Sequence, residues 1–567
     1  MRSSGTASRR MPTRPDAAGA WRDGSAGKRL FKPGRLCLGW PDQTATGLSM
    51  FRAIRIFVVA AVIYLVAGFV FRMVFAVPEA AARVDATAIP ASEETTLGAV
   101  VLPLARANPG TSGVSRLADG TAAFAARLQL ADAAEASIDV RYYIWQKDIT
   151  GLLLLDAMRR AADRGVRVRL LLDDNGVPDI GPELAELSAH PNVDLRLFNP
   201  FVLRSPRILT YVLDFARVNR RMHNKSFTVD GVASVVGGRN IGDIYFSRDP
   251  DVNYFDMDVV ALGRASRDVS ADFDRYWASP SAVPAGLILP ARPADGGVLA
   301  ASLAAAQSAP GSREFETAAR RLPLLAQLLD NARAFEWVDM QLVSDDPAKG
   351  QGRVPDNTLM AARLLAILPE VRHEVMLVSA YFVPGTWLTG VLSEWARAGR
   401  DVRVLTNAQE ATDVLPVHAG YRRYRGELVR AGVQVYELKA RQERPGLARQ
   451  FDLIGSTNSS LHAKTFVIDR SSIFVGSFNF DPRSAMLNTE MGFLIASPKL
   501  SGDMARAFDT RMKGRAYLVE SGPRGGLRWH DLSEGGDDIV HATEPGTTAL
   551  SRGVVRVLGW FPIEWLL

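Results

Sequence analysis

The sequence predicts an α/β protein with two tandem α-β-α sandwich lobes that share one active site at their interface, preceded by one N-terminal transmembrane helix. Three observations support this fold class. An apolar run lies near the N-terminus, strand and helix patterns alternate after it, and one set of polar residues occurs twice at matching spacing. A chain of 567 residues is also too long for a single ordinary hydrophobic core.

Residues 1–49 form a basic tail rich in Arg, Gly, Ser and Pro, which we expect to be disordered. The tail has a net charge of +6, so residues 50–567 sum to about zero. Nucleic-acid enzymes carry their basic surface on the catalytic domain, so this distribution argues against a nucleic-acid partner. Met50 stands directly before a signal-anchor pattern, which leaves two alternatives open: the tail is translated, or translation starts at Met50.

The apolar run over residues 56–77, interrupted by Arg72, predicts a transmembrane anchor. Its length suits a hydrocarbon core of about 30 Å. Arg52 and Arg55 precede the run, so the positive-inside rule places the N-terminus in the cytoplasm. We therefore expect a single-pass protein of the bacterial inner membrane with a periplasmic catalytic domain. A signal peptide cleaved after the small-residue site at 74–76 is the less favoured alternative.

Hydrophobic patterning then predicts the same order of elements twice. Strand, helix and strand are expected at 137–145, 151–162 and 166–172, and again at 374–382, 386–398 and 401–406. The first set is followed by Asp173-Asp174-Asn175-Gly176, which we interpret as a strand-ending turn. The expected organisation is a spacer over 78–110, a first lobe over 111–290, an inter-lobe connection over 291–355, a second lobe over 356–515 and a C-terminal extension over 516–567.

The two copies carry the same polar residues in register. The first copy has His223, Lys225, Asp230, Gly237, Gly238 and Asn240, and the second has His462, Lys464, Asp469, Gly476, Ser477 and Asn479. In both copies Asp follows His by 7 positions, Gly by 14 and Asn by 17. A lone His-x-Lys is usually a solvated strand edge, but a matched repeat of this length indicates an internal duplication.

These residue types suit phosphodiester chemistry. Strand alternation places the histidine and lysine of each copy on one face, and the glycines allow the backbone to approach a ligand. A neutral imidazole can attack phosphorus while an opposing imidazolium protonates the leaving alcohol. We expect Lys225 and Lys464 to neutralise the phosphate. Hydrogen bonds to it are expected from the phosphate-binding segments that contain Gly238, Asn240, Ser477 and Asn479.

Each imidazole also needs an acceptor at its second nitrogen to hold the tautomer. Asp256 and Glu490, which lie 33 and 28 positions after the histidine of their own copy, are the candidates. Asp230 and Asp469 complete the repeated catalytic motif, and we interpret them as structural residues within it.

No metal or other cofactor is expected. The other five histidines, His190, His373, His418, His530 and His541, are scattered without ligand spacing. The single cysteine, Cys37, lies in the tail and can form neither an intrachain disulfide nor a thiolate site.

Through both His-x-Lys-x-x-x-x-Asp motifs and the Gly-x-x-Asn segments, residues 110–515 resemble the phospholipase D superfamily. Within it the chain is most similar to bacterial cardiolipin synthases of the cardiolipin synthase C group. The passages that carry this similarity are NRRMHNKSF (219–227), GGRNIGD (237–243), GSFNFDPRSAMLNTEMG (476–492) and LGWFPIEWLL (558–567). Ile244 departs from the group, which has an acidic residue there, and this departure leaves the motif itself intact.

The resemblance implies a phosphatidyl transferase that works in two steps without metal. His223 would be the nucleophile, and His462 would protonate the leaving alcohol and then deprotonate the acceptor. The implied donor is phosphatidylglycerol or a relative such as phosphatidylethanolamine, and the implied acceptor is the headgroup hydroxyl of a second phosphatidylglycerol. The bilayer is the expected partner. Residues 201–218 and the C-terminal Trp560, Phe561 and Trp565 suit a membrane interface.

Three rival functions are compatible with parts of the sequence. Hydrolysis to phosphatidic acid would use the same residues with water as the acceptor, and the DPRS-x-x-x-NTE passage favours transfer over it. A nuclease of the same superfamily is disfavoured by the near-neutral domain and by the apolar run. A membrane-tethered lipid-binding scaffold with a decayed site is disfavoured because both motifs are intact.

Overall fold

The computed structural model describes residues 43–78, 87–248, 254–330, 335–440, 461–523, 525–531, 539–561 and 564–566. The chain divides into two compact units, Met1–Ile63 and Tyr64–Leu567, and both lobes lie within the second unit. Residues 1–42 of the expected disordered tail lie outside the described residues.

The first helix, α1, spans Gln43–Val74 and therefore begins within the residues that the sequence assigns to the tail. Its portion Phe51–Val74 has a mean hydropathy of 2.5 and is the one helix in the described part of the chain that is long and apolar enough to cross a membrane. The expected span of 56–77 overlaps this portion and extends past its last residue.

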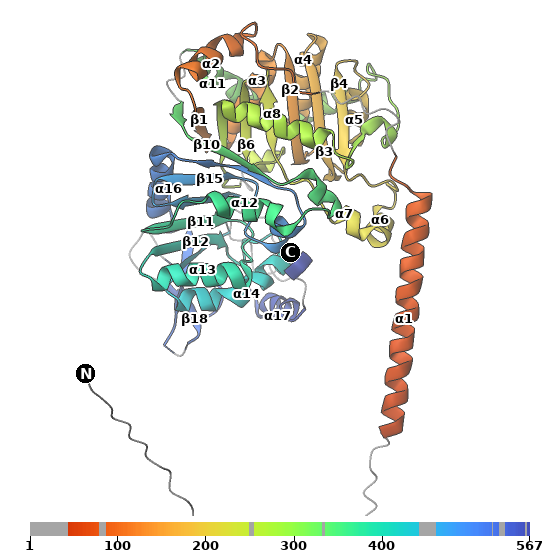
Figure 1. Ribbon diagram of the computed structural model, residues 1–567, viewed down its shortest axis with the longest axis vertical. Coiled ribbons are helices and arrows are strands. Elements are labelled where there is room, and N and C mark those ends of the chain that lie inside the picture. The colour runs from red at the N-terminus through yellow and green to blue at the C-terminus, as the bar shows by residue number, and fades with distance from the viewer. Residues whose placement is uncertain are drawn as a thin grey trace, which may run out of the picture. The chain divides into compact units, whose positions relative to one another are not determined.

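The first lobe is built on a nine-stranded mixed sheet in the order β8-β4-β3-β2-β5-β6-β7-β1-β9. Its strands are β1 (Ser112–Leu117), β2 (Ser137–Ile144), β3 (Arg167–Gly176), β4 (Val193–Phe198), β5 (Ser226–Val229), β6 (Ala233–Gly237), β7 (Asp258–Gly263), β8 (Ala282–Pro284) and β9 (Glu336–Val338). The helices in this part of the chain are α2 (Thr96–Ala107), α3 (Gly120–Ala133), α4 (Ile149–Asp163), α5 (Gly181–Leu187), α6 (Arg207–Leu213), α7 (Phe215–Val218), α8 (Arg264–Trp277), α9 (Val298–Gln307), α10 (Ser312–Arg321) and α11 (Leu324–Leu329). Figure 1 shows this lobe in orange to green.

The second lobe has a ten-stranded mixed sheet in the order β10-β16-β15-β14-β11-β12-β13-β17-β18-β19, drawn in green to blue in Figure 1. Its strands are β10 (Met340–Ser344), β11 (Glu374–Ser379), β12 (Asp401–Asn407), β13 (Gln434–Leu438), β14 (Lys464–Ile468), β15 (Ser472–Gly476), β16 (Met491–Ile495), β17 (Ala516–Ser521), β18 (Leu527–Asp531) and β19 (Ile539–His541). Its helices are α12 (Met360–Ile367), α13 (Gly385–Arg397), α14 (Leu415–Arg430), α15 (Pro482–Met486), α16 (Pro498–Arg511) and α17 (Ala549–Leu558).

The predicted duplication is confirmed in the strand order. In the first sheet β2, β5, β6 and β7 are consecutive antiparallel neighbours, and β11, β14, β15 and β16 repeat this order in the second. A parallel strand pairs with the other edge of β2 and of β11, namely β3 and β12. The α/β fold with two equivalent lobes is thus as the sequence predicts.

Three segments outside the two expected lobes contribute strands to the sheets or a helix to the core. The connection over 291–355 supplies a strand to each sheet, because β9 pairs with β1 and β10 pairs with β16. The C-terminal extension continues the second sheet through β17–β19. The spacer over 78–110 contains α2, whose Leu97 and Val101 are buried in the first lobe.

The predicted turn at Asp173-Asp174-Asn175-Gly176 is wrong, because β3 continues to Gly176. The two carboxylates are used as acceptors instead. Asp173 accepts the N–H of Met222 (2.8 Å) and Asp174 accepts the N–H of Phe201 (2.7 Å). Extended backbone is therefore retained where Asp, Asn and Gly would ordinarily favour a turn.

The two sheets face each other across an apolar layer. Val236 and Val259 from the first sheet lie in one buried cluster with Val475 and Phe493 from the second. Burial of each such side chain contributes about 1.5–3 kcal/mol. This layer fixes the strand ends of the two lobes against each other, and the histidine motifs lie at those ends.

Candidate active site

Each motif histidine lies directly before a short central strand of its lobe and is held by the backbone of the other lobe. His223 precedes β5, and its N–H donates to the carbonyl of Thr489 (2.9 Å). His462 precedes β14, and its N–H donates to the carbonyl of Phe255 (2.9 Å). The two imidazoles are therefore positioned by contacts that exist only when the lobes are docked.

The carboxylates that hold the imidazoles are exchanged between the lobes. His223 Nδ1 lies 2.8 Å from Glu490 Oε2, and His462 Nδ1 lies 2.6 Å from Asp256 Oδ2. The sequence groups each acid with the histidine of its own copy, whereas each contacts the histidine of the opposite copy. Both histidines are 8–9% exposed, and both acids are almost fully buried.

Burial strongly affects the protonation states of these two histidines and two carboxylates. Burial lowers the pKa of His223 to about 4, although Glu490 opposes the shift, and lowers the pKa of His462 to about 3. Burial raises the pKa of Asp256, but the adjacent His462 outweighs that effect and brings the pKa to about 2. These pKa shifts indicate that both imidazoles are neutral and donate Nδ1–H to ionised carboxylates. Each Nε2 is then left with a free lone pair.

The two lysines bring positive charge into the same buried region. Lys225 Nζ donates to the carbonyl of His223 (2.6 Å), and Lys464 Nζ donates to the carbonyl of His462. Burial lowers the pKa of Lys225 to about 7, with Glu490 opposing and Lys464 adding to the shift. A bound phosphate anion would stabilise the charged form of both ammonium groups.

The segments expected to bind phosphate lie in the same buried region as the histidines and lysines. Asn240 accepts the N–H of Ile144 (3.2 Å) and donates to Tyr245 Oη (3.2 Å). Asn479 is 3% exposed, and its Oδ1 has no hydrogen-bond partner among the described residues. This free Oδ1 is an acceptor, so it can take a hydrogen bond from a ligand hydroxyl but not from a phosphate oxygen.

Gly238 and Ser477 occupy equivalent positions in the two copies. Each lies next to one of the carboxylates that hold the histidines, Asp256 and Glu490. A Cβ at Gly238 would lie 2.2 Å from Asp256 Oδ1, so only glycine leaves room for that acid. In the other copy Ser477 Oγ donates to Glu490 Oε2 (2.5 Å). Both residues therefore act on the carboxylates that hold the histidines.

Asp230 and Asp469 lie at the far ends of β5 and β14 from the histidines. Asp230 accepts the N–H groups of Ala136 (2.8 Å) and Ser137 (2.9 Å), which precede β2 or begin it. Asp469 accepts those of His373 and Glu374, both at 2.8 Å. Seven residues of extended chain span roughly 20 Å, so neither carboxylate reaches the imidazole of its motif.

The repeat also includes a tyrosine pair, Tyr143 and Tyr381, which stand 80 and 81 positions before their histidines, but the partner of each tyrosine was not predicted from the sequence. Tyr143 Oη accepts a hydrogen bond from Asn175 (3.1 Å), and Tyr381 Oη donates to Asp413 (2.8 Å). Both partners follow their tyrosine by 32 positions, and this equal spacing is the signal that could have found them. The neutral amide thus belongs to the lobe of His223 and the carboxylate to the lobe of His462.

Aromatic rings also flank both imidazoles. The ring of Tyr143 lies 5.1 Å from that of His223. Tyr245 and Tyr254 lie 5.1 and 5.2 Å from His462, and Tyr254 is stacked on it. These rings shield part of each imidazole from water, in agreement with the low exposure of both histidines.

Comparisons with known proteins agree with this geometry. The family model described as "Cardiolipin synthase, PLD-like domain" matches residues 128–277 and 364–512, one match in each lobe. The chain is 42% identical over 478 residues to cardiolipin synthase C of Escherichia coli (strain K12), covering 83% of this chain and 99% of that protein. An uncharacterized protein of Helicobacter pylori (strain J99) is 32% identical over 470 residues, with 82% of this chain and 91% of that protein covered.

A crystal structure of phosphatidylserine synthase from Haemophilus influenzae Rd KW20 shares the fold. Its TM-score is 0.50 at 15% sequence identity, and the likeness covers 82% of this chain and 99% of that one.

Proposed function

This chain belongs to the family of cardiolipin synthases with phospholipase D-like domains, and on that premise we propose that it transfers a phosphatidyl group from phosphatidylglycerol to the headgroup hydroxyl of a second phosphatidylglycerol. The products are cardiolipin and glycerol. The observation that carries this proposal is the pair of buried imidazoles, each held at Nδ1 by a carboxylate of the opposite lobe.

In the first step His223 Nε2 attacks the phosphorus of the donor, and the bond from phosphorus to the headgroup oxygen breaks. His462, protonated when the phosphate anion is bound between the lobes, gives its proton to that oxygen, and glycerol leaves. Lys225 and Lys464 offset the negative charge on the non-bridging oxygens, and Asn240 and Asn479 border the same site. The result is a phosphatidyl-histidine at His223.

In the second step the acceptor hydroxyl attacks phosphorus from the side on which glycerol left. His462 removes the hydroxyl proton, the bond from phosphorus to His223 Nε2 breaks, and the enzyme returns to its starting state. Glu490 stabilises the imidazolium character that His223 gains when its nitrogen is bonded to phosphorus. The same carboxylate holds the ring in position for both attacks.

The enzyme is proposed to be a single-pass protein of the inner membrane with its lobes on the periplasmic side. The length and hydropathy of Phe51–Val74 support the anchor, and Arg52 and Arg55 support the orientation. Exposed apolar side chains of α6, Ile208 (62%) and Val212 (47%), are consistent with a lipid surface near the catalytic lobes.

The proposal is tested by adding radiolabelled phosphatidylglycerol to membranes from cells that express the full chain, with the His223→Ala variant in parallel. Cardiolipin with an equal amount of glycerol, absent from the variant, is the expected result. Phosphatidic acid in place of cardiolipin would make the enzyme a hydrolase. If neither lipid is formed, the proposed donor is wrong.

A further inference from the structure

We propose that the cavity on the His462 side of the lobe interface binds the acceptor phospholipid, with Arg515 holding the acceptor's own phosphate. This inference rests on the proposed function, and it locates the binding site of the acceptor lipid. The cavity has a volume of about 670 Å³, which is within the usual range for sites of small organic ligands.

The cavity is joined to the catalytic histidine through three consecutive residues. Tyr254 lines the cavity and stacks on His462 at 5.2 Å. Phe255 lines it as well, and its carbonyl accepts the N–H of His462 (2.9 Å). Asp256, the next residue, holds His462 Nδ1. Two lining residues, Tyr254 and Phe255, therefore connect this cavity directly to the residue that must deprotonate the acceptor hydroxyl.

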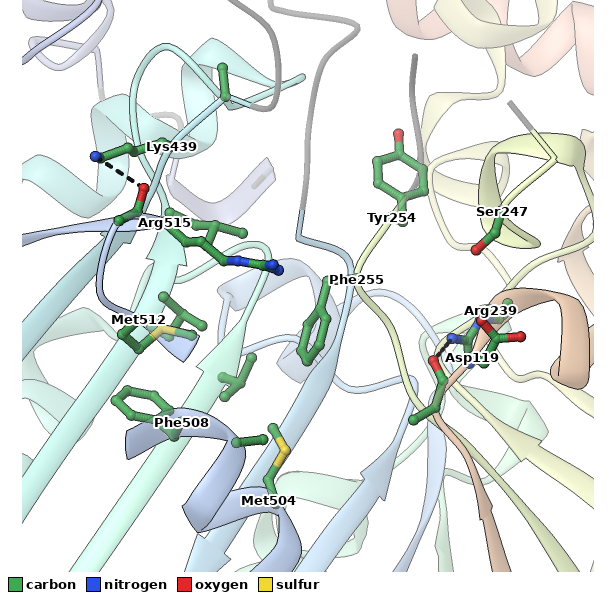
Figure 2. A pocket seen from close by; sticks show the side chains of 18 residues that line it. Asp119, Arg239, Ser247, Tyr254, Phe255, Lys439, Met504, Phe508, Met512 and Arg515 are labelled. Atoms are coloured by element: carbon green, nitrogen blue, oxygen red, sulfur yellow. Dashed lines mark hydrogen bonds between the residues drawn. The ribbon is translucent and has the colours of Figure 1, made fainter. Parts of the chain in front are cut away.

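One wall of the cavity is apolar and comes from the second lobe. Met504 and Phe508 of α16, together with Met512, face the Phe255 ring, which is 39% exposed (Figure 2). Val378, Leu405 and Leu438 complete this wall from the ends of β11, β12 and β13. Such a surface suits the glycerol backbone and proximal acyl segments of a lipid better than it suits a free polyol.

Four charged residues also line the cavity, and three of them are already engaged. Asp119 caps α3 by accepting the N–H of Ala122, and the Arg239 guanidinium donates to backbone carbonyls, including that of Ala118. Lys439 forms an ion pair with Asp531. Arg515 is exposed and makes no ion pair or side-chain hydrogen bond within the described part of the chain. Figure 2 shows its guanidinium extended into the cavity toward Phe255.

The chemistry of cardiolipin formation requires a cation at such a place. The reacting hydroxyl of phosphatidylglycerol is separated from that molecule's own phosphate only by the glycerol headgroup. Two phosphates must therefore approach each other during transfer, and Lys225 and Lys464 are occupied by the phosphate under attack. A separate guanidinium on the His462 side offsets the second negative charge and can bind its oxygens in a bidentate manner.

The test uses the purified full chain in mixed micelles of phosphatidylglycerol with added ethanol. Cardiolipin reports transfer to a lipid acceptor, and phosphatidylethanol reports transfer from the same donor to an alcohol without a phosphate. Arg515→Gln is expected to lower the initial ratio of cardiolipin to phosphatidylethanol about ten-fold, the loss of roughly one charge-assisted contact. Arg515→Lys is expected to recover most of this ratio. Arg506→Gln, a substitution of an exposed arginine on the preceding helix α16, is expected to leave the ratio unchanged.

An unchanged ratio in Arg515→Gln, or an equal fall of both products, would overturn the inference while the proposed function stands. If the unmodified enzyme forms phosphatidylethanol but no cardiolipin, the proposed function itself fails and the acceptor site falls with it.

Discussion

The Nδ1 atom of His223 lies 2.8 Å from the Oε2 atom of Glu490, and these two residues belong to different lobes. The reverse pair, His462 and Asp256, crosses the interface in the opposite direction. Neither lobe alone therefore contains a histidine with its carboxylate. The duplicated fold produces one site that depends on docking of both halves, and this dependence explains why the layer between the sheets is continuous and apolar.

Glu490→Gln is expected to reduce kcat by about 10²–10⁴-fold, because an amide can present an N–H to Nδ1 and favour the tautomer that protonates Nε2. Steady-state cardiolipin formation measures the effect. Glu520→Gln is the matched control, since Glu520 pairs with His530 (3.1 Å) at a far more exposed place. Equal activity of Glu490→Gln and the unmodified enzyme would contradict the assigned role.

The assignment of His223 as nucleophile is tested with a donor that carries a p-nitrophenol headgroup, which leaves without a proton. His462→Ala is expected to release about one equivalent of p-nitrophenol per enzyme and then stop, because no base activates the acceptor. His223→Ala is expected to show no burst. The burst amplitude and the intact mass of the protein measure both outcomes. A burst in His223→Ala but not in His462→Ala would exchange the two roles.

The sequence predicted the duplicated α/β fold because buried strands and motif spacing are local signals, visible at residues such as His223 and His462. The pairing of acids with histidines could not be predicted, because it depends on how two lobes dock over more than 200 positions of chain. The extension of β3 to Gly176 was missed for a similar reason. There the tertiary acceptor roles of Asp173 and Asp174 override the local turn preference of the same residues.

Asp230 is predicted to contribute to stability and not to chemistry. Asp230→Ala leaves the N–H groups of half-buried Ala136 and buried Ser137 without their acceptor, which should lower the free energy of unfolding by roughly 2 kcal/mol. Asp469→Ala should cost less, because His373 and its neighbour Arg372 are exposed to water. Chemical denaturation measures both changes, and kcat/KM for the folded fraction is expected to stay within about two-fold. A large loss of kcat/KM with unchanged stability would place Asp230 in the chemistry.

The protonation of Lys225 predicts the alkaline limit of activity. Burial lowers its pKa to about 7, so in the empty enzyme the ammonium is charged below that pH and becomes neutral above it. Since the charged form attracts the phosphate, kcat/KM should fall as the pH rises through about 7. The fall in kcat should begin at higher pH, because bound phosphate raises the pKa of the lysine.

Lys225→Arg separates this titration from every other group in the site. A guanidinium stays charged across the accessible pH range, so the fall in kcat/KM above pH 7 should move upward or disappear, even if the maximum is reduced by the altered geometry. Lys499→Arg, at an exposed position of α16, should retain the profile of the unmodified enzyme. Profiles of kcat/KM between about pH 5 and pH 9 are measured for all three proteins. If the Lys225 ammonium causes the fall of kcat/KM at alkaline pH, only Lys225→Arg should lose that fall. An identical fall in all three proteins would assign the titration to another group, with Lys464 the first to examine, because burial lowers its pKa as well.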